Sequence, residues 1–550
     1  MPDGSPPSPG SAADRWYLRG RVVDGTGSPP FHGTVLIEGA RIASVDRGVA
    51  DMGDLPGRDV GGSVIAPGFV DLHTHSDVSL LSEPSCISAV GQGITTQVVG
   101  HCGFSAAPVS PTTVERMVEE EPVFGFPGVA WNWEAIPDYL DVVDQAAPAT
   151  NVVTLVGHNT VRRLVMGGDA QPAGAEALAA MRRCLEDALD GGAIGVSTGL
   201  SYAPGMFADE RELVGIAGAA AARGRRYHTH MRYGESSVRE SLEEALRIAK
   251  GAEVALNVSH LYPYAWDAPD EVDRILELVD RANAEGGDVT FDLTVFPRGG
   301  GAWLQQLPGW AREGGLEGTV RRLKEPVIRR QLEQFLVAGN DPDYWDDALI
   351  VKINDPANES LVGRSIADIA RDRGRPPESV ALDLVVEDGQ FWVAPHIKRP
   401  SDLDQLITHD TCVPITDGMA AHPIRHRSLG IMPKTFGSFA ELLGGYVRER
   451  RVLRLEQAVE KLTRLPAQRA DLGDRGVLAR GKVADLVVFD PAIVSNRATE
   501  ADPAALPAGI EQVIVAGAFT LQDGVVTGAR PGRALRPASS QRTPEGRQRG

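Results

Sequence analysis

Three features are scarce in this sequence, and each scarcity excludes a class of protein. Only four of the 550 residues are cysteines, too few for a disulfide framework, so a reducing cytoplasm is the default expectation. No run of about 18 apolar residues occurs, so we expect no membrane span. The formal net charge of −19 argues against nucleic acid or an anionic membrane as the main partner. A small-molecule substrate remains, and nothing indicates the oligomeric state.

The two ends of the chain differ in composition from the rest. Residues 1–14 are rich in Pro, Ser and Gly and lack the basic and apolar regions of a secretory signal. We expect them to form a disordered lead-in, and residues 533–550 to form a disordered tail.

The middle of the chain alternates apolar, β-branched runs with amphipathic stretches. The runs cover residues 64–73, 94–100, 151–158, 193–200, 226–232, 254–261, 289–296 and 412–418. Continuous apolar runs are typical of parallel strands that are covered on both faces. The stretches between them have helical spacing, as at 236–253 and 269–287. The pattern predicts an α/β protein with a (β/α)8 TIM-type barrel over residues 63–471.

Two further units are indicated outside this pattern. Residues 15–62 and 472–530 contain hairpin-like strands around Gly and Asp, which predicts one small β-sandwich domain built from both termini. Residues 300–411 are too long for a simple barrel loop and contain helical patterns. We expect them to form an inserted, lid-like subdomain between the last two barrel strands.

The predicted strands end in side chains that bind metals. The first strand ends in His73 and His75, and alternation along a strand places both on one face. Four more such residues end other strands: Cys102, His230, His260 and Asp417. A hydrophobic core does not require ionisable side chains at the same level of five strands. The active sites of barrels lie at the carboxyl ends of their strands, where these residues are. Imidazole, thiolate and carboxylate ligands together suit Zn²⁺.

Several stretches together resemble the amidohydrolase superfamily and, within it, the N-acyl-D-amino-acid deacylases (D-aminoacylases). They are "APGFVDLHTHSD", "GITTQVVGHCGFS", "LVGHNTVRRLVMGG", "GAIGVSTGLSYAPG", "YHTHMR", "VSHL", "ITDG" and "ADLVVFDP". The cysteine of "GHCGFS" is the most specific element, because other branches bridge their metals with a modified lysine on strand 4. No lysine occurs in "AIGVSTGLSYAPG".

The resemblance implies two metal positions. One tightly bound Zn²⁺ would be held by Cys102, His230 and His260. A second, weaker divalent ion would lie at a more exposed position, whose ligands would be His73, His75 and the nearby Asp417. Whether one or both positions are occupied is left open.

The resemblance also implies catalytic roles. Asp417 would be the general acid and base, and Tyr202 would polarise the scissile carbonyl through a hydrogen bond. Other histidines near the predicted ligands are interpreted as structural: His101, His158 and His228.

The positions that bind the substrate carboxylate in the family differ here. Tyr262 replaces a lysine, Phe296 replaces a tyrosine, and Gly301 replaces a serine or threonine. A hydrogen bond to a charged group contributes about 1.5–3 kcal/mol, so these losses should weaken carboxylate binding by orders of magnitude. Arg298 and Arg425 are the candidates that would compensate.

We therefore expect a zinc hydrolase of a non-peptide C–N bond whose substrate is not a plain N-acyl-D-amino acid. Five side chains would make its pocket more aromatic: Phe296, Tyr262, Tyr264, Trp266 and Trp303. The alternatives are a metal-dependent lyase or other non-hydrolytic enzyme acting on a specialised metabolite, and a non-enzymatic scaffold.

Overall fold

The computed structural model describes residues 15–120, 122–126, 128–168, 170–233, 237–426 and 429–537. The expected lead-in at 1–14 and most of the expected tail lie outside these residues. For residues 533–537 the expectation of disorder is wrong. The Val152 amide donates to the Arg533 carbonyl at 2.9 Å, and the Leu535 amide donates to the Val152 carbonyl at 2.8 Å. Leu535 is buried, so this segment is fixed by an added strand-like pairing.

Parallel strands form two sheets at the centre of the molecule. One sheet has the order β5-β6-β7 and the other the order β16-β12-β11-β10-β9-β8. Their bounds are β5 (Phe69–Asp71), β6 (Ile94–Val99), β7 (Asn151–Thr154), β8 (Val156–Gly157), β9 (Gly195–Gly199), β10 (Arg226–His230), β11 (Leu256–Val258), β12 (Val289–Thr294) and β16 (Cys412–Ile415). Every residue of β6, β9 and β12 is buried, as expected for strands covered on both faces.

The two parallel sheets are connected at both of their edges. Leu155 alone separates β7 from β8, so one stretch of chain joins the two sheets. At the far edges, Thr74 after β5 forms a parallel bridge with Gly418 after β16. The His75 amide donates to the Gly418 carbonyl at 2.7 Å, and the Asp417 amide donates to the His73 carbonyl at 3.0 Å. The carboxyl ends of the first and last strands therefore lie side by side.

Helices cover the outside of the parallel strands. They include α6 (Ala175–Asp190), α7 (Glu210–Ala221), α8 (Val238–Ala252), α9 (Glu271–Ala284), α16 (Pro400–Thr408) and α18 (Leu455–Leu462). Further helices are α1 (Ser79–Ser82), α2 (Ile87–Val90), α3 (Pro111–Glu120), α4 (Ile136–Ala146), α5 (His158–Met166), α17 (Lys434–Glu441), η6 (Leu442–Glu449) and α19 (Arg464–Arg469). In the described part of the chain, no helix combines the length and hydropathy that a membrane crossing requires.

Helix α8 shows why the sequence folds in this way. The Ser237 hydroxyl accepts from the Glu240 amide, and the Glu240 carboxylate accepts from the Ser237 amide, which is a capping box. Leu242 and Ala245 are buried along one stripe, as the helical spacing predicts. The helix ends at Ala252, and Glu253 after it has a left-handed backbone with φ of 52°.

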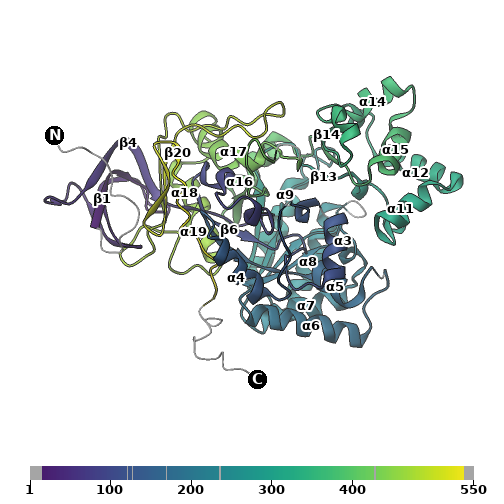
Figure 1. The fold of residues 1–550 in the computed structure, drawn as a ribbon, viewed down its shortest axis with the longest axis horizontal. Helices are drawn as coiled ribbons and strands as arrows, with labels where there is room; N and C mark the ends of the chain where they lie inside the picture. The colour runs from purple at the N-terminus through teal and green to yellow at the C-terminus, as the bar shows by residue number, and fades with distance from the viewer. Residues whose placement is uncertain are drawn as a thin grey trace.

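A curled sheet is built from both ends of the chain. Its order is β20-β19-β18-β17-β4-β1-β2-β3, with bounds β1 (Arg15–Val22), β2 (Phe31–Glu38), β3 (Arg41–Arg47), β4 (Gly57–Pro67), β17 (Leu486–Phe489), β18 (Ile510–Val515), β19 (Ala518–Gln522) and β20 (Val525–Val526). Figure 1 shows these purple and yellow strands together at one end of the molecule. In a flat sheet β1 and β19 would lie about 19 Å apart. The rings of Trp16 and Phe519 instead lie 5.0 Å apart, so the two halves of the sheet face a shared core.

The first predicted barrel strand, residues 64–73, is in fact two strands. Residues up to Pro67 belong to β4 of the curled sheet, and only β5 joins the parallel strands. The chain turns at Gly68, where an added Cβ would lie 2.3 Å from the Thr95 side chain. The first part of the terminal β unit therefore ends at residue 67 rather than 62.

The insertion has a hydrophobic core of its own. Its elements are β13 (Gly301–Ala302), η3 (Trp303–Gln306), α10 (Gly309–Arg312), α11 (Gly315–Leu323), α12 (Pro326–Gly339), α13 (Tyr344–Asp347), β14 (Leu349–Lys352), α14 (Ile366–Arg373), α15 (Pro377–Asp388) and β15 (Trp392–Ala394). Figure 1 shows it at the end opposite the curled sheet. Helix α16, which we expected in the insertion, instead buries Leu403 and Leu406 in the main core. The insertion therefore ends before α16.

We predict that Leu336→Ala destabilises the insertion by about 2–5 kcal/mol, because it opens a cavity at a fully buried position. The matched control is Val337→Ala on the same helix, whose side chain is 57% exposed, with an expected change within about 0.5 kcal/mol. Hydrogen exchange of α12 and α15 measures both. Equal protection in the two variants would contradict a separate packed core.

Candidate metal centre

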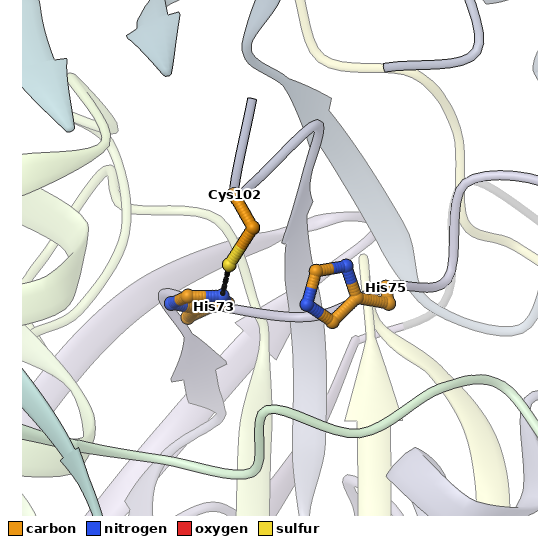
Figure 2. Close-up of side chains that lie close together, drawn as sticks. All are labelled: His73, His75 and Cys102. Carbon is orange, nitrogen blue, oxygen red and sulfur yellow. Dashed lines mark hydrogen bonds between the residues drawn. The ribbon is translucent and has the colours of Figure 1, made fainter. Parts of the chain in front are cut away.

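Residues distant in sequence converge at the carboxyl ends of the parallel strands. His230 is the last residue of β10, and the other predicted ligands follow β5, β6, β11 and β16 within a few residues. Figure 2 shows the Cys102 sulfur directed at the ring of His73, with the ring of His75 beside them. All six predicted ligands therefore lie at one edge of the strands, as the sequence indicated.

Cys102 belongs to two groups of potential ligand atoms. One group is His73, His75 and Cys102, the other is Cys102, His230 and His260, and within each group the ligand atoms lie within 4.8 Å of one another. The Cys102 Sγ lies 3.5 Å from His73 Nε2 and 3.7 Å from His260 Nε2. Tetrahedral Zn²⁺ with typical bond lengths separates a sulfur and a nitrogen ligand by about 3.6 Å. The spacing therefore suits two metal positions that share this sulfur.

The polar atoms of His230 support the same interpretation. Both of its ring nitrogens are buried, and neither has a hydrogen-bond partner within the described structure. An unsatisfied buried polar group costs about 1–3 kcal/mol. A metal ion between Cys102, His230 and His260 would supply the missing partner for one nitrogen, so the donor set fits Zn²⁺.

Electrostatics favour a thiolate at Cys102. Burial raises the pKa of the thiol, but the nearby imidazoles of His73, His230 and His260 outweigh this effect and hold it well below its usual value. The thiolate is the form that binds metals. Burial and the neighbouring His260 lower the pKa of His230, which favours the neutral imidazole that metal binding requires.

Three of the converging residues have backbones in the left-handed region. The φ angles are 54° at Cys102, 38° at His260 and 46° at Asp417. Such conformations are uncommon outside glycine and are costly, and they persist where the surrounding structure enforces them. The turn at Cys102 also needs glycine opposite it, because a Cβ on Gly199 would lie 1.9 Å from the Cys102 carbonyl oxygen.

Asp417 lies between the histidines and a lysine. Its Oδ1 is 3.2 Å from His75 Nε2 and 3.6 Å from His73 Nε2, and its Oδ2 accepts a hydrogen bond from the Lys434 ammonium. Burial raises the pKa of this carboxyl group, but Lys434 and the histidines more than offset it and hold the pKa well below its usual value. Asp417 is therefore ionised and able to accept a proton.

Asp292, which the sequence analysis did not single out, holds two of the ligands in place. Its Oδ1 accepts from the His260 amide at 2.6 Å, and its Oδ2 lies 3.4 Å from His73 Nδ1. Asn257 donates to the same carboxylate at 2.8 Å. A carboxylate on the second nitrogen of a ligating histidine fixes the ring and its tautomer.

Of the three histidines interpreted as structural, one stacks on the predicted ligand His73, a second packs against that ring, and the third contacts a glutamate. The ring of His101 stacks on His73 at 3.9 Å, and His228 meets His101 edge-on at 5.2 Å. His158 lies 2.7 Å from a Glu212 carboxylate oxygen. None of them joins the two ligand groups found among the described residues.

A cavity of about 400 Å³ opens over the centre. Its lining includes Cys102, His260 and Asp417, together with Tyr202, whose ring lies 4.7 Å from that of His230. Tyr262 also lines it. The volume is within the range of about 300–1,000 Å³ that is typical of small-molecule sites.

Several residues predicted to bind substrate lie elsewhere. Arg298 donates to the Asp347 carboxylate at 2.9 Å, and Arg425 pairs with Glu83. Neither arginine lines the cavity, and neither does Phe296. Trp303 is also absent from the lining because it is buried in the core of the insertion. The two arginines are committed to ion pairs that hold loops together.

Lys398 is a cavity residue that the sequence analysis missed. Its side chain is buried, its Nζ donates to the Thr294 hydroxyl at 2.6 Å, and it lies 4.9 Å from the centre of the Tyr262 ring. Burial, with a smaller effect of Lys434, lowers its pKa to about 7. The segment "PHIKRPSD" carries no motif, so only the fold reveals that it reaches the cavity.

Comparisons with known proteins agree with this site. The amidohydrolase family matches residues 57–521. N-acyl-D-glutamate deacylase of Alcaligenes xylosoxydans xylosoxydans is 32% identical over 533 residues, which cover 95% of this chain and 96% of the relative.

Two solved structures are similar over almost the whole chain. The N-acyl-D-glutamate deacylase of Bordetella bronchiseptica, in complex with zinc and a phosphonate inhibitor, has a TM-score of 0.78 and 30% identity, covering 96% of this chain and 100% of that one. A D-aminoacylase with a binuclear metal centre has a TM-score of 0.78 and 30% identity, covering 95% and 99%. The chain therefore belongs to the amidohydrolase family, as a D-aminoacylase-like amidohydrolase that acts on C–N bonds other than peptide bonds.

Proposed function

We propose that this protein is a zinc-dependent hydrolase of an amide bond in a small N-acylated substrate that carries an anionic group. The observation that carries the proposal is the Cys102 sulfur 3.5 Å from a nitrogen of His73 and 3.7 Å from a nitrogen of His260, the spacing of two ligands on one zinc ion, beside the ionised Asp417. The relatives that contain zinc or a binuclear metal centre support the same chemistry. Nothing in the structure specifically favours a lyase or another non-hydrolytic enzyme.

In this proposal the parallel strands close into a (β/α)8 barrel. The joined β7–β8 stretch and the bridge from Thr74 to Gly418 support a continuous ring of strands. The similarity to D-aminoacylase supports the same architecture. Closure would hold the ligands of strands β5 and β16 at a fixed separation.

Cys102, His230 and His260 would hold the tighter ion, and His73, His75 and Asp417, together with the shared Cys102 sulfur, would form the weaker position. A bound Zn²⁺ would supply a Lewis acid toward the amide carbonyl and toward water. Asp417 would accept a proton from water at a carboxylate oxygen and deliver it to the leaving nitrogen. Lys434 supports the first of these steps because it keeps Asp417 ionised. Tyr202 would donate a hydrogen bond to the carbonyl oxygen.

Lys398 would bind the anionic group of the substrate. A buried cation is normally paired, yet no carboxylate lies within 4.0 Å of Lys398 Nζ among the described residues. The family resemblance places a lysine at position 262, and here Tyr262 lies beneath the Lys398 ammonium instead. The positive charge would therefore come from another element and approach from another direction.

The different position of this positive charge supports an altered substrate specificity. Phe296 and Gly301 lack the hydroxyl groups expected at their positions, so an α-carboxylate would lose those contacts. We propose that the preferred substrate is not a plain N-acetyl-D-amino acid. A high rate on any common N-acetyl-D-amino acid would contradict this part of the proposal.

We predict that Cys102→Ala removes tightly bound zinc and lowers kcat at least about 10²-fold, because it removes the ligand shared by both positions. The control is Cys86→Ala, another buried cysteine that does not belong to either ligand group. Zinc content per chain and initial rates measure the effect. Zinc retention in Cys102→Ala, or equal losses in both variants, would argue against the assignment.

We predict that Asp417→Asn lowers kcat by about 10²–10⁴-fold, since it removes the proton acceptor, while the tightly bound zinc remains. Initial rates and zinc content measure this. Turnover of the wild-type enzyme in H₂¹⁸O should place label in the acid product. Unlabelled product would identify a non-hydrolytic reaction, and a variant that keeps more than about a tenth of its rate would exclude Asp417 as the proton carrier.

We predict that Lys398→Met raises KM for anionic substrates by about 10-fold or more, the effect of losing one charge-assisted contact. Arg425→Ala should leave KM unchanged because Arg425 is paired with Glu83 outside the cavity. Because the pKa of Lys398 is about 7, the binding of anionic ligands should also depend on pH. Lys398 loses its charge as the pH rises through 7, so carboxylate inhibitors should bind more weakly above that pH, whereas Lys398→Arg should bind them independently of pH to about 9. Unchanged KM in Lys398→Met would refute the assignment.

A further inference from the structure

A row of aromatic rings leads from the metal centre to the surface. The ring of Tyr233 lies 5.9 Å from that of the predicted ligand His260 and 6.0 Å from that of Tyr264. Tyr264 in turn stacks on Trp266, with centroids 4.6 Å apart and planes inclined by 8°. The ring of Tyr262 lies 6.1 Å from that of Tyr233 and 5.7 Å from that of Tyr264. We call these four side chains, Tyr233, Tyr262, Tyr264 and Trp266, the aromatic row.

The aromatic row becomes more exposed with distance from the metal centre. Tyr262 and Tyr264 are half-buried, and Trp266 is 60% exposed. All four side chains line the same cavity as the predicted ligands. Phe335 of the insertion also lines it and is 43% exposed. Apolar surface from two separate units of the fold therefore faces one continuous space.

The exposure of these rings needs an explanation other than packing. A large apolar side chain gains stability by burial, and Trp266 contributes only one face to its stack on Tyr264. Trp266 nevertheless stays 60% exposed and lines a cavity that is larger than an acetyl group requires. Exposed aromatic rings in a concave site are a common means of binding an apolar ligand group.

We propose that the aromatic row and Phe335 form a subsite for an apolar acyl group of several carbon atoms, aliphatic or aromatic, on the substrate. This proposal rests on the amide hydrolase function proposed above and adds the class of substrate. The anionic group would lie at Lys398, whose ammonium stands over the Tyr262 ring. The apolar group would extend from there along Tyr264 to Trp266, so the substrate is an amphipathic anionic amide.

A substrate series with one amino acid and a growing acyl group tests the subsite. It lengthens the acyl chain of N-acyl-D-alanine from acetyl to octanoyl. In this series, kcat/KM of the zinc-loaded enzyme should rise about fourfold per added methylene, which corresponds to about 0.8 kcal/mol per buried CH₂.

The variant that tests the subsite is Trp266→Ala, and its matched control is Trp310→Ala. Trp310 is also partly exposed, at 37%, but lies on α10 outside the cavity lining. Trp266→Ala should lower kcat/KM for the longest member at least about tenfold more than it lowers kcat/KM for N-acetyl-D-alanine. Trp310→Ala should match the wild type. A flat series in the wild type, or the same losses in both variants, would overturn the proposal.

A binding measurement separates this proposal from the hydrolase function. Calorimetry compares butanoate with octanoate on the zinc-loaded protein, because neither molecule contains an amide. Octanoate should bind at least about tenfold more tightly, and Trp266→Ala should remove that advantage whether or not any amide is hydrolysed. Equal affinity for the two carboxylates would overturn the subsite, even in an active hydrolase.

Discussion

The sulfur of Cys102 is the contact on which the rest of the site depends. It lies 3.5 Å from a nitrogen of His73 and 3.7 Å from a nitrogen of His260, and so connects ligands from different strands. To bring it there, the chain adopts a left-handed turn and leaves no room for a side chain on Gly199. An ion bound at this sulfur would offset these local costs, because the free energy of metal binding also stabilises the folded chain.

The predicted metal ligands and the walls of the cavity come from different parts of the fold. The predicted metal ligands stand on short strand ends that are fixed by parallel pairing, by Asp292 and by the contact between the first and last strands. The walls of the cavity come from loops and from the insertion, which has its own core. Walls of this kind can change without disturbing the centre, as the position of Lys398 over Tyr262 illustrates.

The sequence was sufficient for the centre and insufficient for the walls. His73, Cys102, His230 and Asp417 follow strands, and the carboxyl ends of parallel strands share an edge, so their convergence could be predicted. Lys398 follows a long insertion, and no local pattern indicates where such a segment returns. Arg298 and Arg425 lie near the site in sequence, but the ion pairs that hold them depend on tertiary contacts. The split of residues 64–73 into two strands was hidden for a similar reason, because periodicity does not reveal the close contact at Gly68.

X-ray absorption spectroscopy of the zinc-loaded protein tests the shared sulfur most directly. Our account predicts one sulfur neighbour at about 2.3 Å and nitrogen or oxygen neighbours at about 2.0–2.1 Å. The sulfur neighbour should disappear in Cys102→Ala. A wild-type spectrum with nitrogen and oxygen neighbours alone would contradict the account, because the ion would then be held without Cys102.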